Sequence, residues 1–206
     1  MKKFVLLLLL ALLIIIIFLA FDIKNAFRVL PIKESATLEV PPFADWRIFS
    51  AQSDKFEVML PAVPQYARET VPVSITDNSM RRYEMYVSQQ INGPVFMISL
   101  ITYPKDYNTK DEQGILHSIV DELMQSKQGN KIVNIKESLY QNHEAIDFDI
   151  QNKKFNVMGK AFIIDHTVYL LTYIADLPDS VLADYEKFIN SFKLPKQESS
   201  LPPLSK

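Results

Sequence analysis

Short stretches rich in aromatic and β-branched residues recur along the chain, separated by proline and polar residues. Such stretches predict β-strands. In the first half of the chain they occupy residues 46–51, 56–60, 67–75, 83–90 and 95–103, and the third is the weakest of them. The last two flank Asn92-Gly93-Pro94, which is typical of a hairpin turn. We therefore expect these two strands to pair.

A helical pattern follows between residues 109 and 129. Thr109-Lys110-Asp111-Glu112 matches a capping box, and Gly129 stands where a helix would end. Apolar residues recur at three- and four-residue spacing and form one stripe, namely Ile115, Leu116, Ile119, Val120, Leu123 and Met124. The pattern predicts an amphipathic helix with one buried face.

Three or four further strands are predicted in the second half, within residues 131–139, 144–150, 155–164 and 167–174. In the second of these stretches apolar residues alternate with Asp147 and Asp149, which indicates one buried and one solvated face. Asp165-His166 is short enough to form a tight hairpin between the last two strands. Gly159, midway along a strand, indicates a bulge or a point of close packing.

A second amphipathic helix is predicted at the end of the pattern. Asp179 and Ser180 lie near its start, and Pro195 lies beyond its end. The order of strands, helix, strands and helix predicts an α+β fold, in which two amphipathic helices pack on a largely antiparallel sheet.

The N-terminus carries a different pattern, in which Phe4 to Phe21 form an unbroken run of apolar residues between Lys3 and Asp22. Its length is close to the minimum for a helix that crosses a bilayer, so residues 1–22 are predicted to be an uncleaved membrane anchor. A cleaved signal peptide is the alternative, but Phe18 stands where a cleavage site requires a small residue. We expect the N-terminus to stay inside and the following domain to lie on the periplasmic or extracellular side.

The remaining boundaries follow from proline and polar residues. Residues 23–44 contain Pro31, Pro41 and Pro42 and are interpreted as a tether. Residues 45–194 are predicted to be the folded domain, and the polar, proline-rich residues 195–206 a disordered tail.

Composition and charge exclude several classes of function. Apolar residues make up 48% of the chain and charged residues 22%, which is typical of a folded protein. The net charge is −2 and the chain contains no long basic run, so nucleic acid is not an expected partner. Cysteine is absent, which excludes disulfides, thiol catalysis and a lipid-modified cysteine. Arg81-Arg82 is the densest positive spot near the domain, and we interpret it as a solvated strand end.

Candidate chemistry is sparse. The four glycines are too scattered for a phosphate-binding loop, no Gly-x-Ser-x-Gly elbow occurs, and no cofactor is expected. The mixed group of side chains that suits a metal ion or acid–base chemistry is His143, Asp147, Asp149, Asp165 and His166. Carboxylates on an exposed strand face are more commonly there for solubility, so no catalytic or metal site is assigned.

Four tyrosines allow a second interpretation. Tyr83, Tyr86, Tyr103 and Tyr107 are candidates for the lining of an apolar groove. The commoner arrangement has each tyrosine ring partly buried in a core.

Three segments carry a resemblance to a known family. Phe56-Glu-Val-Met-Leu-Pro-Ala-Val-Pro64 follows Trp46, Tyr103-Pro-Lys-Asp-Tyr107 follows a tyrosine-rich strand, and Phe188-Ile-Asn-Ser-Phe-Lys-Leu194 ends the domain. Together they resemble the PsbP-like/DcrB-like group of antiparallel α/β domains. The resemblance implies an accessory, assembly or binding protein without a shared set of catalytic residues, so no site residue is carried over.

Two main hypotheses follow. The first is a non-catalytic interaction domain that is displayed at a membrane and binds a protein partner. The second is a metal-dependent or hydrolytic enzyme that uses the region of His143, Asp147, Asp149 and His166. A small-molecule or lipid carrier is a weaker third hypothesis, which requires a sizeable apolar pocket between sheet and helix.

Overall fold

The computed structural model describes residues 46–51, 55–73, 79–177 and 182–194. The predicted anchor at 1–22, the tether at 23–44 and the tail at 195–206 lie outside these residues. Neither of the helices that the structure describes has the length and apolar character needed to cross a bilayer.

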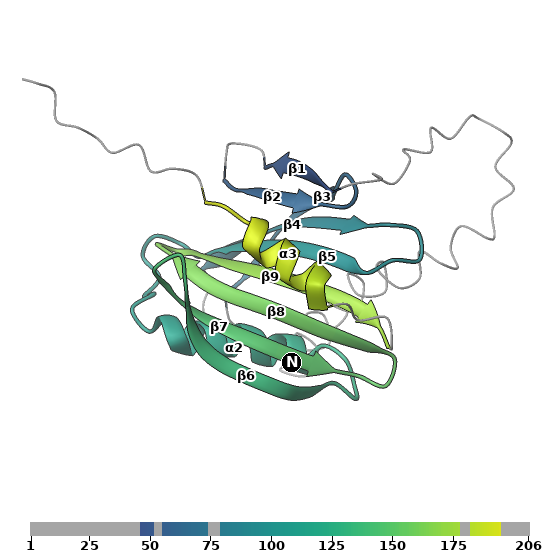
Figure 1. Ribbon diagram of the computed structural model, residues 1–206. Coiled ribbons are helices and arrows are strands. Elements are labelled where there is room, and N and C mark those ends of the chain that lie inside the picture. The colour runs from purple at the N-terminus through teal and green to yellow at the C-terminus, as the bar shows by residue number, and fades with distance from the viewer. Residues whose placement is uncertain (1–45, 52–54, 74–78, 178–181, 195–206) are drawn as a thin grey trace, which may run out of the picture.

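The fold is α+β, as the sequence predicted, with strands in two antiparallel sheets (Figure 1). The small sheet pairs β1 (Arg47–Ser50) with β2 (Glu57–Leu60). The large sheet has the order β3-β4-β5-β9-β8-β7-β6. Its strands are β3 (Gln65–Pro72), β4 (Met80–Gln89), β5 (Val95–Thr102), β6 (Lys131–Tyr140), β7 (His143–Gln151), β8 (Phe155–Ile164) and β9 (Thr167–Asp176). The helices are α2 (Glu112–Gln125) and α3 (Leu182–Ser191).

The turns use Asn, Asp and Gln where glycine is more usual. Gln141 and Asn142 join β6 to β7 with φ angles of 49° and 68°, as a two-residue type I′ turn requires. Asp165 adopts a φ of 53° in the predicted hairpin between β8 and β9. The predicted pairing of β4 with β5 is confirmed, and Asn92, rather than Gly93, takes the positive φ of 58° in their turn.

Helix α2 begins later than the predicted capping box. Asp111 is the N-cap, because its carboxylate accepts the backbone N–H of Gly114 at 3.0 Å. The Thr109 hydroxyl instead donates to the backbone oxygen of Asp165 at 3.3 Å. The helix ends at Gln125, so Gly129, with a φ of 90°, lies in the connection to β6 and not at the end of the helix.

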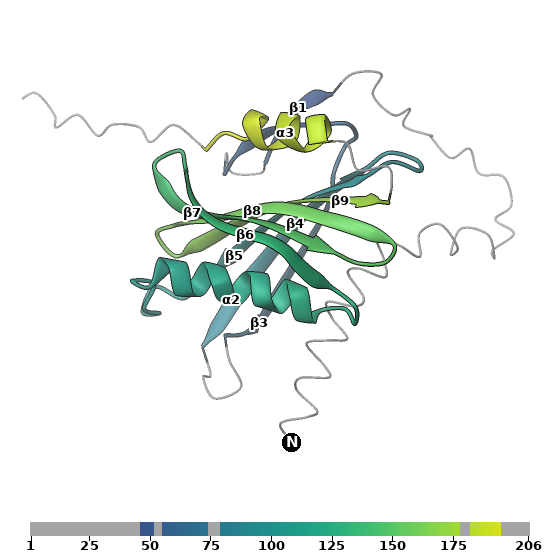
Figure 2. The ribbon, with the colours of Figure 1, turned by 60° about the horizontal axis from the view of Figure 1, so that its bottom comes forward.

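The large sheet lies between α3 and α2 (Figure 2). A hydrophobic core lies on each of its two faces. On one face, α3 and the small sheet cover an aromatic core that includes Phe56, Phe96, Phe162, Phe188 and Phe192. Tyr140 ties α3 to this face, because its hydroxyl donates to the backbone oxygens of Ile189 at 2.7 Å and Phe192 at 3.3 Å.

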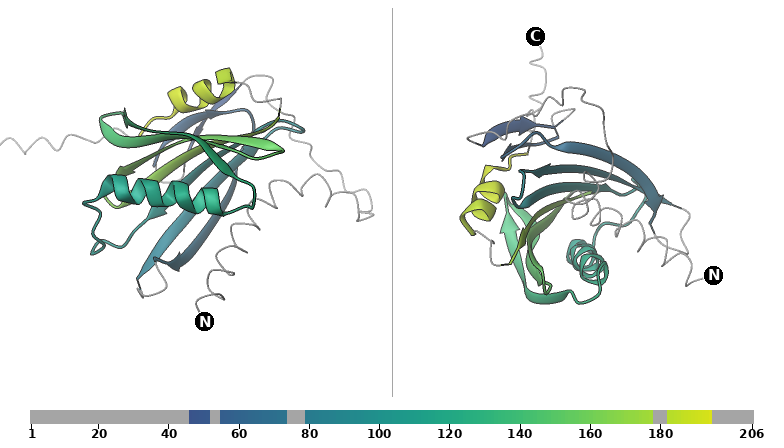
Figure 3. Two further views of the ribbon diagram at one scale, coloured as in Figure 1. Left: turned by 90° about the horizontal axis from the view of Figure 1, so that it is seen from below. Right: turned by 90° about the vertical axis from the view of Figure 1, so that its right-hand side faces the viewer.

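On the other face, α2 packs mainly on β7 and β8 (Figure 3). Four residues of its predicted stripe are buried there, namely Ile115, Leu116, Ile119 and Val120. The sheet curves around this helix, as the right-hand view of Figure 3 shows. The alternation of Ile146, Phe148 and Ile150 with Asp147 and Asp149 divides β7 between the two faces, as the sequence predicted.

Candidate functional site

The five side chains proposed for metal or acid–base chemistry do not meet at one point. His143 begins β7, and Asp165 and His166 form the turn between β8 and β9. Asp147 lies four residues further along β7 than His143, a separation of roughly 13 Å along a strand. Within the described part of the chain, no group of three or more His, Asp or Glu side chains is arranged to hold a metal ion.

Asp147 belongs to a polar cluster on the α3 face of the sheet. Its carboxylate forms an ion pair with the ammonium of Lys160, which is only 8% exposed. The same ammonium lies 3.3 Å from the Ser138 hydroxyl and 5.4 Å from the centre of the Tyr140 ring. A buried lysine needs a compensating negative charge, and Asp147 supplies it. This pairing is a structural role for Asp147.

Asp149 lies on the same face and is bound differently. Burial raises the pKa of its carboxyl group, and a hydrogen bond from Asn156 offsets part of that rise. One side-chain oxygen of each residue is buried without a hydrogen-bond partner among the described residues. Tyr185 of α3 lies near both carboxylates, and burial together with their charges raises the pKa of its hydroxyl.

Arg81 is buried, so the interpretation of Arg81-Arg82 as a solvated strand end is wrong for this residue. Its guanidinium lies 3.1 Å from both carboxylate oxygens of Glu122 on α2 and 3.3 Å from the Tyr103 hydroxyl. The ring of Tyr83 lies 5.1 Å from the guanidinium carbon. Arg81 thus connects α2 to a part of the sheet that the helix does not cover. No signal near residue 81 in the sequence identifies Glu122 as its partner.

The tyrosines do not line one groove. Tyr83 and Tyr103 surround Arg81 on the α2 face, and Tyr103 stacks on Tyr107 with ring centres 4.7 Å apart. Tyr86 belongs to the aromatic core on the opposite face. The commoner arrangement, with tyrosine rings in the cores, is the one observed.

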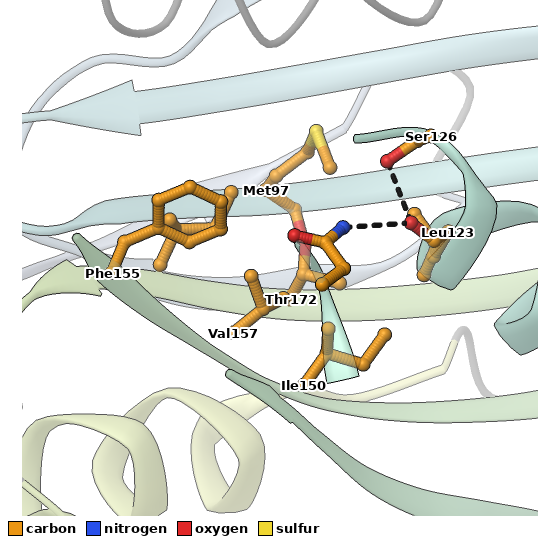
Figure 4. Close-up of a pocket in the computed structure, with 9 residues that line it drawn as sticks. Met97, Leu123, Ser126, Ile150, Phe155, Val157 and Thr172 are labelled. Carbon is orange, nitrogen blue, oxygen red and sulfur yellow. Dashed lines mark hydrogen bonds between the residues drawn. The ribbon is translucent and has the colours of Figure 1, made fainter. Parts of the chain in front are cut away.

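A small cavity lies at the C-terminal end of α2, between the helix and the sheet (Figure 4). Its volume is about 40 Å³, and its lining includes Met97, Leu123, Phe155 and Thr172. Ser126 and Asn130 donate to the backbone oxygen of Leu123 at 2.6 and 3.3 Å and cap the helix end beside it. Small-molecule pockets typically enclose about 300–1,000 Å³. This cavity is too small to support the hypothesis of a small-molecule or lipid carrier.

The most exposed apolar strand is β6, at one edge of the large sheet. Val133 is 59% exposed, Ile135 36% and Leu139 75%. The opposite edge strand, β3, instead presents Arg68 and Glu69 and ends at Pro72, features that discourage pairing with another chain. The pairing of β6 with β7 is regular from Asn134 to Tyr140. Before Asn134 the register shifts, and Val133 has no partner residue on β7. The sequence predicted this strand but not its place at an edge.

Comparison with known proteins bears on the fold. No protein-family model and no curated protein matches the sequence. The solution structure of cyanobacterial PsbP (CyanoP) from Synechocystis sp. PCC 6803 is similar over 80% of this chain and 99% of that one, with a TM-score of 0.50 and 10% identity. The crystal structure of PA94 from Pseudomonas aeruginosa, a protein of unknown function, covers 68% of this chain and 88% of its own, with a TM-score of 0.37 and 13% identity. At 10% identity the similarity to CyanoP concerns the fold alone and carries no site residue over. The protein has a PsbP-like fold, as the segments around Trp46, Tyr103 and Phe188 indicated.

Proposed function

We propose that the protein is a non-catalytic interaction domain, anchored in a membrane by residues 1–22 and displayed on the periplasmic or extracellular side. Its partner is a protein that binds along the edge strand β6. The observation that carries the proposal is the exposed edge itself, with Val133, Ile135 and Leu139 in contact with solvent. Long edge strands with exposed apolar residues are templates for an added strand.

The register of the hairpin defines how a partner would bind. Tyr140 and His143 close the two-residue turn, and hydrogen-bonded and non-hydrogen-bonded pairs alternate from there along the strands. We therefore expect Ile135, Glu137 and Leu139 to direct their backbone N–H and C=O groups away from β7. These three residues also share the face on which α2 packs, because Ile135 pairs with Phe148 and Glu137 with Ile146. A partner strand would gain backbone hydrogen bonds and two apolar side chains at the same edge.

Site-specific photocrosslinking in native membranes tests the partner. A photoreactive residue at position 139 is expected to give a discrete crosslinked protein, and the same residue at position 68 on β3 is the matched control. Glu137→Pro removes one outward N–H and should reduce the crosslink at least tenfold, since an edge position tolerates proline. Glu137→Thr keeps the N–H and should leave the crosslink in place.

The result that overturns this part of the proposal is an equal yield from positions 139 and 68, or no effect of Glu137→Pro in a folded protein. Asp149→Asn provides a separate comparison with the enzyme hypothesis. The variant should leave the crosslink unchanged, because Asp149 lies on the opposite face of the sheet from Ile135 and Leu139.

Anchoring and orientation need their own experiment. The full chain is expected to resist extraction from membranes by alkaline carbonate, and a chain that begins at Asp45 is expected to be released. Protease added from outside should digest the domain without membrane disruption. Extraction of the full chain, or protection of the domain, would contradict the proposal.

A further inference from the structure

Two turns and the end of a strand lie together at one end of the domain. We call it the hairpin end and define it by the β4–β5 turn, the β7–β8 turn and the end of β9. Strand register brings these together, because Val95 pairs with Ile174 and Phe155 pairs with Asp176. The right-hand view of Figure 3 looks toward this end.

The described chain also begins at the hairpin end. The ring of Trp46 packs on Phe96 at 5.0 Å, near the start of β5. Arg47, the next residue, pairs with Leu60, and the following Pro61 accepts a hydrogen bond from Gln90 in the β4–β5 turn at 3.4 Å. The described chain therefore enters the domain at this end.

Large apolar side chains are exposed around the same end. Ile91 at the tip of the β4–β5 turn is 82% exposed, and Val63 in the β2–β3 connection is 62% exposed. Leu182, the first residue of α3, is 58% exposed, and Leu177 after β9 is 41% exposed. Val63, Ile91 and Leu177 come from three different connections and Leu182 from the start of α3, so no single strand or helix requires all four to be apolar.

Lysines accompany these apolar residues. Lys153 and Lys154 form the β7–β8 turn, and Lys131 begins β6 next to it, since Lys131 pairs with Gln151. All three side chains are exposed, and no ion pair of theirs is found in the part of the chain that the structure describes. The hairpin end also holds the exposed carboxylate of Asp176 at the end of β9. The opposite end has mixed charges, with the acidic residues Asp106, Asp111, Glu112, Glu144 and Asp165 and the basic residues Arg82, Lys105, Lys110 and Lys193.

We propose that the hairpin end is a membrane-docking surface for bilayers rich in anionic lipids. The apolar tips of Ile91, Val63 and Leu182 enter the boundary between headgroups and acyl chains, and Lys131, Lys153 and Lys154 bind lipid phosphates. The opposite end then points away from the bilayer. This inference rests on the anchor of the proposed function, but not on the partner that binds β6.

The tether explains why a separate docking surface has an effect. Residues 23–45 span at most about 80 Å when fully extended, so the anchor alone does not fix the distance or orientation of the domain. Attachment to the same bilayer raises the effective concentration of the docking surface, so weak individual contacts suffice. Docking fixes the orientation, with the strands directed away from the membrane.

Single-cysteine labelling of the full chain tests the proposal, because the natural sequence contains no cysteine. Ile91→Cys places an environment-sensitive fluorophore at the hairpin end, and Asn142→Cys places it in the β6–β7 turn at the opposite end. The labelled proteins are reconstituted in vesicles of phosphatidylcholine alone or with about one-third phosphatidylglycerol. In the mixed vesicles, quenchers attached to lipid should quench the label at position 91 but not at position 142.

Charge variants separate docking from anchoring. Lys131→Gln, Lys153→Gln and Lys154→Gln together should lower the ratio of docked to undocked domain by roughly a hundredfold, as should high salt. The matched control changes three lysines elsewhere, namely Lys105→Gln, Lys110→Gln and Lys193→Gln, and should have little effect. Circular dichroism checks that both triple variants are folded.

Three outcomes would overturn the docking surface. The first is an unquenched label at position 91 in vesicles that still retain the full chain after carbonate extraction. The anchor would then hold, and only the docking surface would be contradicted. The second is equal quenching at positions 91 and 142. The third is shielding of position 91 in native membranes but not in lipid vesicles, which would assign this end to a protein partner. Release of the full chain by carbonate would instead contradict the anchor of the proposed function.

Discussion

Gly159 lies in β8 directly beneath the ring of Phe148 on β7. A Cβ atom at this position would lie 2.2 Å from the ring carbon Cζ and 2.7 Å from both Cε atoms. Phe148 is only 3% exposed and belongs to the core under α2, so its ring has little room to move. The close packing that the sequence indicated is therefore confirmed, and the strand pairing at Gly159 shows no bulge.

Gly159→Ala is accordingly expected to lower the free energy of unfolding by about 1–3 kcal/mol through overpacking. Urea denaturation followed by circular dichroism measures the change. Phe148→Leu in the same chain should recover part of the loss, so the double variant should be more stable than the sum of the single changes predicts. A Gly159→Ala variant as stable as the natural protein would show that the ring shifts freely.

Glu84 is the charged residue with the most partners on the α3 face. Its carboxylate oxygens lie 2.7 and 2.6 Å from the Lys55 ammonium, and one lies 2.9 Å from the Arg82 guanidinium. Burial alone would raise the pKa of Glu84, but the hydrogen bond and charge of Lys55, with Arg82 and Arg68, outweigh it and lower the pKa. A lowered carboxyl pKa means that the unfolded chain binds the proton more tightly, so stability increases with pH through this range.

Glu84→Gln should therefore destabilise the domain at pH 7 by about 1–3 kcal/mol, the range for hydrogen bonds to charged groups. The contribution of the carboxylate is present above the ordinary pKa of about 4.3 and is lost as pH falls through the lower folded-state value. Denaturation at pH 7 and pH 3 should show the difference between variant and natural protein shrinking at pH 3. Glu137→Gln, on exposed β6, is the control and should change stability by less than about 0.5 kcal/mol at either pH. A constant difference for Glu84→Gln would contradict the assignment.

At the level of elements, the C-terminal end of helix α3 is held by polar contacts as well as by its apolar face. Gln141 donates to the Phe192 backbone oxygen at 2.9 Å, and the Ser191 hydroxyl accepts the backbone N–H of Met59 at 3.0 Å. The Tyr140 hydroxyl reaches the last turn of the helix, where backbone oxygens lack helical partners. Tyr140→Phe keeps the ring against Phe162, which lies 4.9 Å away, and removes only these hydrogen bonds. We expect a loss of about 1 kcal/mol and faster hydrogen exchange in α3 than in α2. Equal effects on both helices would indicate a general loss of stability instead.

Sequence patterns located most strands and both helices because the signals for them are local. The alternation in β7, the stripe of α2 and the turn at Asn92 each depend on residues close together in the chain. The pairs that set the chemistry are distant in sequence. Lys160 meets Asp147 only after β7 and β8 pair, and Arg81 meets Glu122 from 41 residues away. The five-residue candidate group was assembled from nearness in sequence, and strand geometry spreads it along β7 and a turn.

At the scale of the whole molecule, the two hydrophobic cores share the strands of one sheet. Phe162 belongs to the core under α3, and its neighbours Ala161 and Ile163 belong to the core under α2. Consecutive residues of β8 thus point into different cores, so the loss of either core exposes the other face of the same strand. We expect the two cores to unfold together, in the all-or-none manner of small domains.

Trp46 makes this expectation measurable, because it is the only tryptophan and packs on Phe96 at the α3 face. Leu116 is fully buried under α2 on the opposite face, and Leu116→Ala should cost about 2–5 kcal/mol. The substitution is measured in a chain of residues 45–194. There, Leu116→Ala should lower the urea midpoint from Trp46 fluorescence by the same amount as the midpoint from far-ultraviolet circular dichroism. Leu139→Ala, at an exposed position, serves as the control and should move neither midpoint appreciably. If Leu116→Ala lowers only the dichroism midpoint, the α2 face unfolds separately, and a partner bound along β6 would then stabilise only its own side of the sheet.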